Sequence, residues 1–128
     1  MKRSVFLLIT AFASFAFGAM LFFIPTFAAH LLNIATTPQT LSVIRGMGGL
    51  IIGSGAINYF LHNQNNSEVV KGLLLANIIT HLLGLCADIW GVADGALTIS
   101  KMAPVEITHL FVGIGSLYYY FKINKVSK

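Results

Sequence analysis

Hydrophobic residues in this chain occur in four long blocks separated by short polar segments. The blocks cover about residues 4–24, 41–61, 69–90 and 105–121. Each block is close to the roughly 20 residues that an α-helix needs to cross a hydrocarbon core of about 30 Å. The pattern therefore predicts an all-α protein, a four-helix transmembrane bundle with short loops that forms one membrane domain over residues 1–128.

The segment between the first two blocks contains residues typical of a further short helix. Phe27, Leu31 and Ile34 follow one another at helical spacing, which predicts a helix that lies in the membrane interface. Thr37 is a typical N-cap, and Pro38 then occupies the first position of the next helix.

The two later connections are also visible in the sequence. Residues 62–67 form a short polar segment rich in asparagine, which indicates a turn. Residues 91–103 form a second connection that contains Asp94 and Gly95. Because proline is favoured at the first position of a helix, Pro104 is expected to open the fourth span.

The amino-acid composition agrees with a membrane protein and argues against a nucleic-acid-binding one. Hydrophobic residues make up 56% of the chain and charged residues only 9%, with a mean hydropathy of +0.81, whereas soluble domains contain about a quarter charged residues. The net charge of +4 comes from basic residues that lie mostly at block ends and form no stripe. Cys86 is the one cysteine, which excludes an intrachain disulfide, and we expect it to be a small buried hydrophobe.

The distribution of basic residues predicts how the chain is oriented. When successive connections are assigned to alternate sides of the membrane, two basic residues, Arg45 and Lys101, fall on one side and six on the other. The six are Lys2, Arg3, Lys71, Lys122, Lys125 and Lys128. The positive-inside rule then places both the N-terminus and the C-terminus in the cytoplasm, and short loops suit a multi-pass protein of a bacterial inner (plasma) membrane.

Polar residues inside the predicted spans are the candidates for a functional site, because a charge at the membrane centre costs about 2.5 to 3.5 kcal/mol. In the third block such residues recur on one helical face, and in the fourth block two lie three positions apart. The predicted orientation brings most of them to the outer side of the membrane. The resulting candidate is an outer-leaflet polar pocket formed by Arg45, Asn77, His81, Asp88, Glu106 and His109.

Three interpretations of these residues remain open at the level of the sequence. Arg45 could form a structural salt bridge with Asp88 or Glu106, or the residues could line a ligand pocket. They could also be independent surface groups, since a carboxylate such as Glu106 is favoured in the first turn of a helix, and an arginine near a helix end can extend its charge to water.

Motifs of known active sites are absent or incomplete. Glu106 and His109 match the E-x-x-H half of a di-iron site, but that site needs a second such motif and two further glutamates, and the chain has four acidic residues in all. H-E-x-x-H, C-x-x-C and G-x-S-x-G do not occur. The sequence predicts no metal site and leaves open the cofactor, the catalytic residues and whether the protein is an enzyme.

Glycines in the second block predict close helix packing and also show a family resemblance. Gly46, Gly49 and Gly53 place small residues along the helix, which favours close approach by a neighbour. The run from Arg45 to Gly53 reads R-G-M-G-G-L-I-I-G. With Asp94-Gly95 after the third block and Glu106 at the start of the fourth, the chain resembles the DoxX-like group of small four-helix bacterial membrane proteins.

The resemblance implies a four-helix membrane fold, and it implies the fold more than the function. The named family is associated with a thiosulfate and quinone oxidoreductase. The third span of such relatives often ends in a Gly-Arg pair, whereas this chain has Asp88 near that point. A partner of Arg45 is therefore expected to differ from that in the relatives.

Two functions are compatible with the sequence. The first is a small accessory membrane protein that binds a small molecule, a lipid or a quinone in the outer pocket. The second is a membrane-embedded enzyme or proton-coupled carrier that uses His81, Asp88, Glu106 and His109. The expected partners are the lipid bilayer and either a second copy of the chain or a membrane partner subunit, with no nucleic acid.

Overall fold

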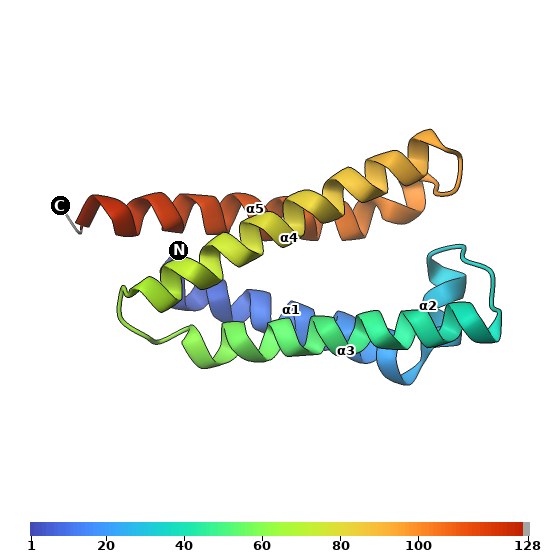
Figure 1. Ribbon diagram of the computed structural model, residues 1–128, viewed down its shortest axis with the longest axis horizontal. Helices are drawn as coiled ribbons and strands as arrows, with labels where there is room; N and C mark the ends of the chain where they lie inside the picture. The colour runs from blue at the N-terminus through green and yellow to red at the C-terminus, as the bar shows by residue number, and fades with distance from the viewer. Residues whose placement is uncertain (127–128) are drawn as a thin grey trace. The chain divides into compact units, whose positions relative to one another are not determined.

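The structure, a computed structural model, describes residues 1–126, with side chains as far as Ile123. The described residues form five α-helices and no strand, as Figure 1 shows. They are α1 (Arg3–Phe23), α2 (Pro25–Leu31), α3 (Pro38–Leu61), α4 (Glu68–Ala93) and α5 (Ile99–Val126). The predicted all-α class is therefore confirmed. The chain divides into two compact units, Met1–Asn63 and Gln64–Lys128, and each is described by itself.

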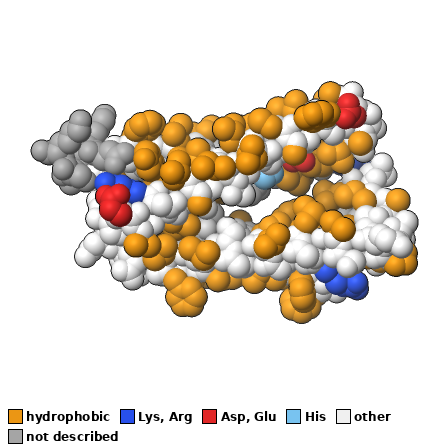
Figure 2. Space-filling model, in the orientation of Figure 1, with side chains coloured by type: hydrophobic (Ala, Val, Ile, Leu, Met, Phe, Trp, Pro, Cys, Tyr) orange, Lys and Arg blue, Asp and Glu red, His pale blue; other side chains and the backbone are white. Residues whose placement is uncertain are grey.

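Three of the helices in the described part of the chain are long and apolar enough to cross a membrane, namely α1, α3 and α4. They coincide with the first three predicted spans and indicate a membrane protein. Large hydrophobic side chains lie on the outside of the helices, for example Leu83 and Ile114, each 63% exposed. Figure 2 shows hydrophobic side chains over much of the visible surface, which is unusual for a soluble protein.

α5 is helical as predicted, but it is not among the three spans found in residues 1–126. The predicted span at 105–121 contains Glu106, His109 and three consecutive tyrosines, which lower its hydropathy. Its 28 residues correspond to a helix about 42 Å long at about 1.5 Å per residue, which is more than a bilayer core requires. The four-span bundle therefore stays a prediction.

In the first unit α1 and α3 lie side by side, and their backbones come into direct contact (Figure 1). A Cβ atom placed on Gly48 would lie 2.6 Å from the backbone nitrogen of Phe22, and one on Gly18 would lie 2.9 Å from the carbonyl oxygen of Gly48. One on Gly55 would lie 3.1 Å from the carbonyl oxygen of Ala11. The two helices can approach this closely because these positions have no side chain.

Gly46, Gly49 and Gly53, which the sequence analysis proposed for helix packing, do not make this contact. No atom lies within 4 Å of a Cβ placed on Gly46 or Gly53, and a Cβ on Gly49 would touch only the ring of Phe22, at 3.9 Å. α3 has glycines on two faces, and the face with Gly48 and Gly55, seven residues apart, meets α1. A run of small residues shows that close approach is allowed, but it does not show which face is used.

The predicted short helix between the first two spans is present as α2. It ends before Ile34, because Asn33 adopts a left-handed backbone conformation with φ of 59°. The buried cluster that holds it consists of Ala28 and Ala29 of α2, Leu21 of α1 and Ile44 of α3. Phe27 and Leu31 are exposed. Its position in a membrane interface stays a prediction.

Side-chain caps define where α3 and α4 begin. The hydroxyl of Thr37 accepts a hydrogen bond from the backbone nitrogen of Thr40 at 3.1 Å, which confirms the predicted N-cap. The hydroxyl of Ser67 accepts one from the backbone nitrogen of Val70 at 3.4 Å. Both contacts satisfy a backbone N–H group that a helix start leaves without an internal partner.

The connection between α4 and α5 is shorter than predicted. Only residues 94–98 separate the two helices, and Gly95 turns the chain with φ of +73°. The predicted helix start at Pro104 is wrong, because α5 begins at Ile99 and Pro104 lies inside it. The backbone nitrogen of Met102 donates to the carbonyl of Thr98, and the Met102 side chain is buried. This packing stabilises an additional turn before the proline, although proline prefers the first position of a helix.

Candidate polar site between α4 and α5

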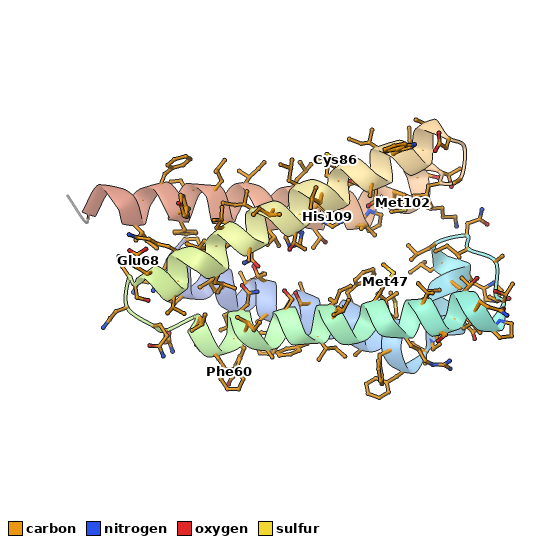
Figure 3. All side chains as sticks on the ribbon, in the orientation of Figure 1. Met47, Phe60, Glu68, Cys86, Met102 and His109 are labelled. Carbon is orange, nitrogen blue, oxygen red and sulfur yellow. The ribbon has the colours of Figure 1, made fainter. Side chains whose placement is uncertain are left out.

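The histidines of α4 and α5 face each other because each lies against a glycine of the opposite helix. A Cβ placed on Gly84 would lie 2.5 Å from Cε1 and 2.8 Å from Nε2 of His109. The His109 ring therefore lies directly against the backbone of α4. Figure 3 shows the position of His109 between α4 and α5. In the same way, the Cβ of His81 lies 3.6 Å from where a Cβ on Gly113 would be.

The two histidines are in direct contact although 28 residues separate them in the chain. Their Nδ1 atoms lie 2.9 Å apart, within hydrogen-bond distance, and the rings meet at an interplanar angle of 61°. One Nδ1 must donate a hydrogen and the other must accept it, because two lone pairs or two hydrogens at this distance would repel. The contact joins the polar faces of α4 and α5.

Asp88 of α4 approaches the other ring nitrogen of His109. Its Oδ2 lies 3.6 Å from Nε2, and the side chains of His109 and Asp88 are 18% and 21% exposed. This distance is longer than that of a hydrogen bond, so the interaction is electrostatic attraction across a small gap. His109 consequently interacts through both ring nitrogens, with His81 on one side and Asp88 on the other.

Glu106 lies one turn before His109 on α5. Both of its carboxyl oxygens are buried, and neither has a hydrogen-bond partner in the part of the chain that the structure describes. Asp88 is near enough to act on this carboxyl group electrostatically, but the two groups do not meet in the geometry of a hydrogen bond. A buried polar atom without a partner is costly, by about 1 to 3 kcal/mol.

The structure therefore brings together four of the six residues predicted for the pocket. We call His81, Asp88, Glu106 and His109 the polar cluster. Asn77 is buried one turn before His81 on α4. Arg45 is exposed on α3 in the other unit, and its pairing with Asp88 or Glu106 stays a prediction.

The glycines that make room for the histidines were not among the residues predicted for the site. Gly84 and Gly113 are small residues on the polar faces, and each follows a histidine by three or four positions. A glycine one turn after each histidine, Gly84 after His81 and Gly113 after His109, is the feature that could have identified the contact. It became meaningful only once α4 and α5 were seen to be antiparallel neighbours (Figure 1).

Other chemical groups near the site are limited. No group of three or more His, Cys, Asp or Glu side chains within residues 1–123 is arranged to hold a metal ion. Cys86 was expected to be buried but is exposed on α4, and it points away from His109 (Figure 3).

Fold and site together define a membrane protein whose described residues are all-helical, with three helices long and apolar enough to cross a membrane and a polar cluster between α4 and α5. The chain belongs to the family described as domain of unknown function DUF8292, whose family model matches residues 7–127. No curated protein and no solved structure matches the chain. The family match makes no link to the DoxX-like group, so that resemblance stays a prediction.

Proposed function

We propose that this protein is a small polytopic membrane protein that binds a small molecule, such as a lipid or a quinone, at the polar cluster. The observation that supports the proposal best is the Glu106 carboxyl group, whose two oxygens are buried without a hydrogen-bond partner in the described residues. A molecule that bonds to these oxygens would remove the cost of burying them. We expect it to act as an accessory protein in a bacterial inner membrane, alone or with a partner subunit.

A purely structural role explains only part of the polar cluster. A hydrogen bond between helices, such as that of His81 with His109, is worth about 0.6 to 2 kcal/mol in a membrane. It is therefore a sufficient reason for the two histidines. Glu106 takes no part in that bond and gains no hydrogen bond in the described structure, so packing alone leaves its position unexplained.

Native mass spectrometry of the gently solubilised protein tests the proposal. We expect a small molecule bound to the wild-type chain, and Glu106→Gln should reduce its occupancy by about tenfold or more, a loss of about 1.4 kcal/mol. Glu68→Gln is the matched control, because Glu68 is an exposed carboxylate that pairs with Lys71 at the start of α4. An empty wild-type protein, or equal occupancy in both variants, would contradict the proposal.

The alternative is a membrane-embedded enzyme or proton-coupled carrier. It is favoured by the two-sided contact of His109, since an imidazole that touches a group at each nitrogen can receive a proton at one and release it at the other. The same mass spectra separate binding from catalysis. A bound molecule that keeps its mass during incubation supports binding, whereas a change in its mass shows chemistry.

The proposed topology includes α5 as a fourth span, with both termini in the cytoplasm. Reporter domains fused to each end and expressed in a bacterium measure this directly. Four spans should place both reporters on the cytoplasmic side, because an even number of crossings returns the chain to its starting side. If the C-terminal reporter is active outside while the N-terminal one is active inside, α5 does not cross the membrane.

A further inference from the structure

The contacts of His109 determine how hydrogens are distributed in the polar cluster. Its Nε2 lies 3.6 Å from Oδ2 of Asp88, and its Nδ1 lies 2.9 Å from Nδ1 of His81. A neutral imidazole has a hydrogen on only one of its two nitrogens. The position of that hydrogen on His109 therefore decides which histidine donates in the bond between them.

The negative charge of Asp88 favours one of the two arrangements. A carboxylate attracts an N–H group and repels a nitrogen lone pair, so the hydrogen of His109 belongs on Nε2. The Nδ1 of His109 is then an acceptor, and the Nδ1 of His81 must donate to it. A neutral His81 with its hydrogen on Nδ1 has a bare lone pair on Nε2.

Packing against Gly84 fixes the place of the His109 ring, and its polar contacts keep the ring in the orientation that this arrangement requires. Its ring atoms lie so close to Gly84 that even a methyl group would not fit there. If the ring turned over by half a rotation, carbon atoms would replace both nitrogens at their contacts with His81 and Asp88. Both interactions would then be lost, so the observed orientation is the one that the polar cluster stabilises.

We propose that Asp88 is a positioning residue that sets the hydrogens of the two histidines, so that Nε2 of His81 is the hydrogen-bond acceptor of the polar cluster. The positions of these hydrogens also indicate the class of ligand, and this step rests on the proposed function. A lone pair on Nε2 of His81 can only accept a hydrogen bond. This position therefore takes a molecule that presents an O–H or N–H group, and it discriminates against molecules that can only accept.

Nitrogen NMR of isotope-labelled histidine in lipid nanodiscs tests the positions of the hydrogens without any ligand. His30→Gln and His62→Gln leave only His81 and His109 to be assigned. We expect the hydrogen on Nδ1 of His81 and on Nε2 of His109. Asp88→Asn should abolish this preference, whereas Asp94→Asn, in the exposed turn after α4, should leave it unchanged.

Two results would overturn the role of Asp88. One is a wild-type His81 that has its hydrogen on Nε2, as it would if His109 were a cation that donates from both nitrogens. The other is an unchanged pattern in Asp88→Asn. The circular dichroism of each variant shows whether its helices are intact. Unfolding is then not mistaken for a change in the positions of the histidine hydrogens.

Phenol and anisole test the ligand class, because they have similar shapes but only phenol has an O–H group. Phenol should shift the Nε2 resonance of His81, and anisole should not. Equal shifts, or no shift with either, would overturn the inferred ligand class. These results are distinguishable from failure of the proposed function. If the protein binds no small molecule, native mass spectrometry shows an empty protein, and the hydrogen positions measured by NMR are unaffected.

Discussion

Gly48→Ala should destabilise the unit formed by α1–α3, by roughly 1 to 3 kcal/mol. The added methyl group would lie 2.6 Å from the backbone nitrogen of Phe22 and 2.8 Å from the carbonyl oxygen of Gly18. Because these are backbone atoms, no change of side-chain rotamer relieves the overlap, and α1 and α3 must move apart. Circular dichroism during thermal or denaturant unfolding in detergent measures the effect.

The matched control is Gly53→Ala on the same helix. A Cβ at this position has no atom within 4 Å, and replacing glycine by alanine inside a helix is worth about 0.5 to 1 kcal/mol in conformational entropy. The two variants should therefore have effects of opposite sign. If Gly53→Ala destabilised the protein as much as Gly48→Ala, the packing face would be the one with Gly46 and Gly53, as the sequence analysis proposed.

Gly84→Ala should remove ligand binding with little loss of helix content. The methyl group would lie 2.5 Å from Cε1 of His109, which is a side-chain atom that can move. The ring would leave α4, and the 2.9 Å contact between His109 and His81 would break. We expect occupancy of the bound molecule to fall by about tenfold or more, or about 1.4 kcal/mol.

Gly72→Ala is the control for that prediction. Gly72 is on the exposed side of α4, and no atom lies within 4 Å of a Cβ at its position. Native mass spectra and the histidine NMR spectrum should resemble those of the wild type. Intact binding in Gly84→Ala would show that the ligand does not depend on the His81–His109 contact, and it would place the binding site elsewhere in the protein.

Much of the helical pattern follows from the sequence because each element has a local physical cause. The blocks near 20 residues long predict α1, α3 and α4, and Thr37 acts as the cap that its position before Pro38 indicates. The start of α5 did not follow. Pro104 prefers a first helical position, but it lies inside α5, in the turn after the buried side chain of Met102, and burial is not visible in the local sequence.

The candidate site was partly predictable for the same reason. Helical spacing alone assigned His81 and Asp88 to one face of α4, and Glu106 and His109 to one face of α5. It did not reveal that the histidines contact each other through their Nδ1 atoms, or that Gly84 makes the space for this contact. Such facts depend on the register between two helices, and register is a property of the packed pair.

By itself, the sequence determined that the chain is helical, apolar and able to enter a membrane, because hydropathy and helical periodicity act along a single segment. It also determined which polar residues need a partner within these segments. Only the tertiary structure decided that Gly48 and Gly55 form the contact with α1, and that His109 lies between His81 and Asp88. The physical reason is that close packing depends on the shapes of two helix surfaces that fit together. The local sequence of one helix describes only one of these surfaces.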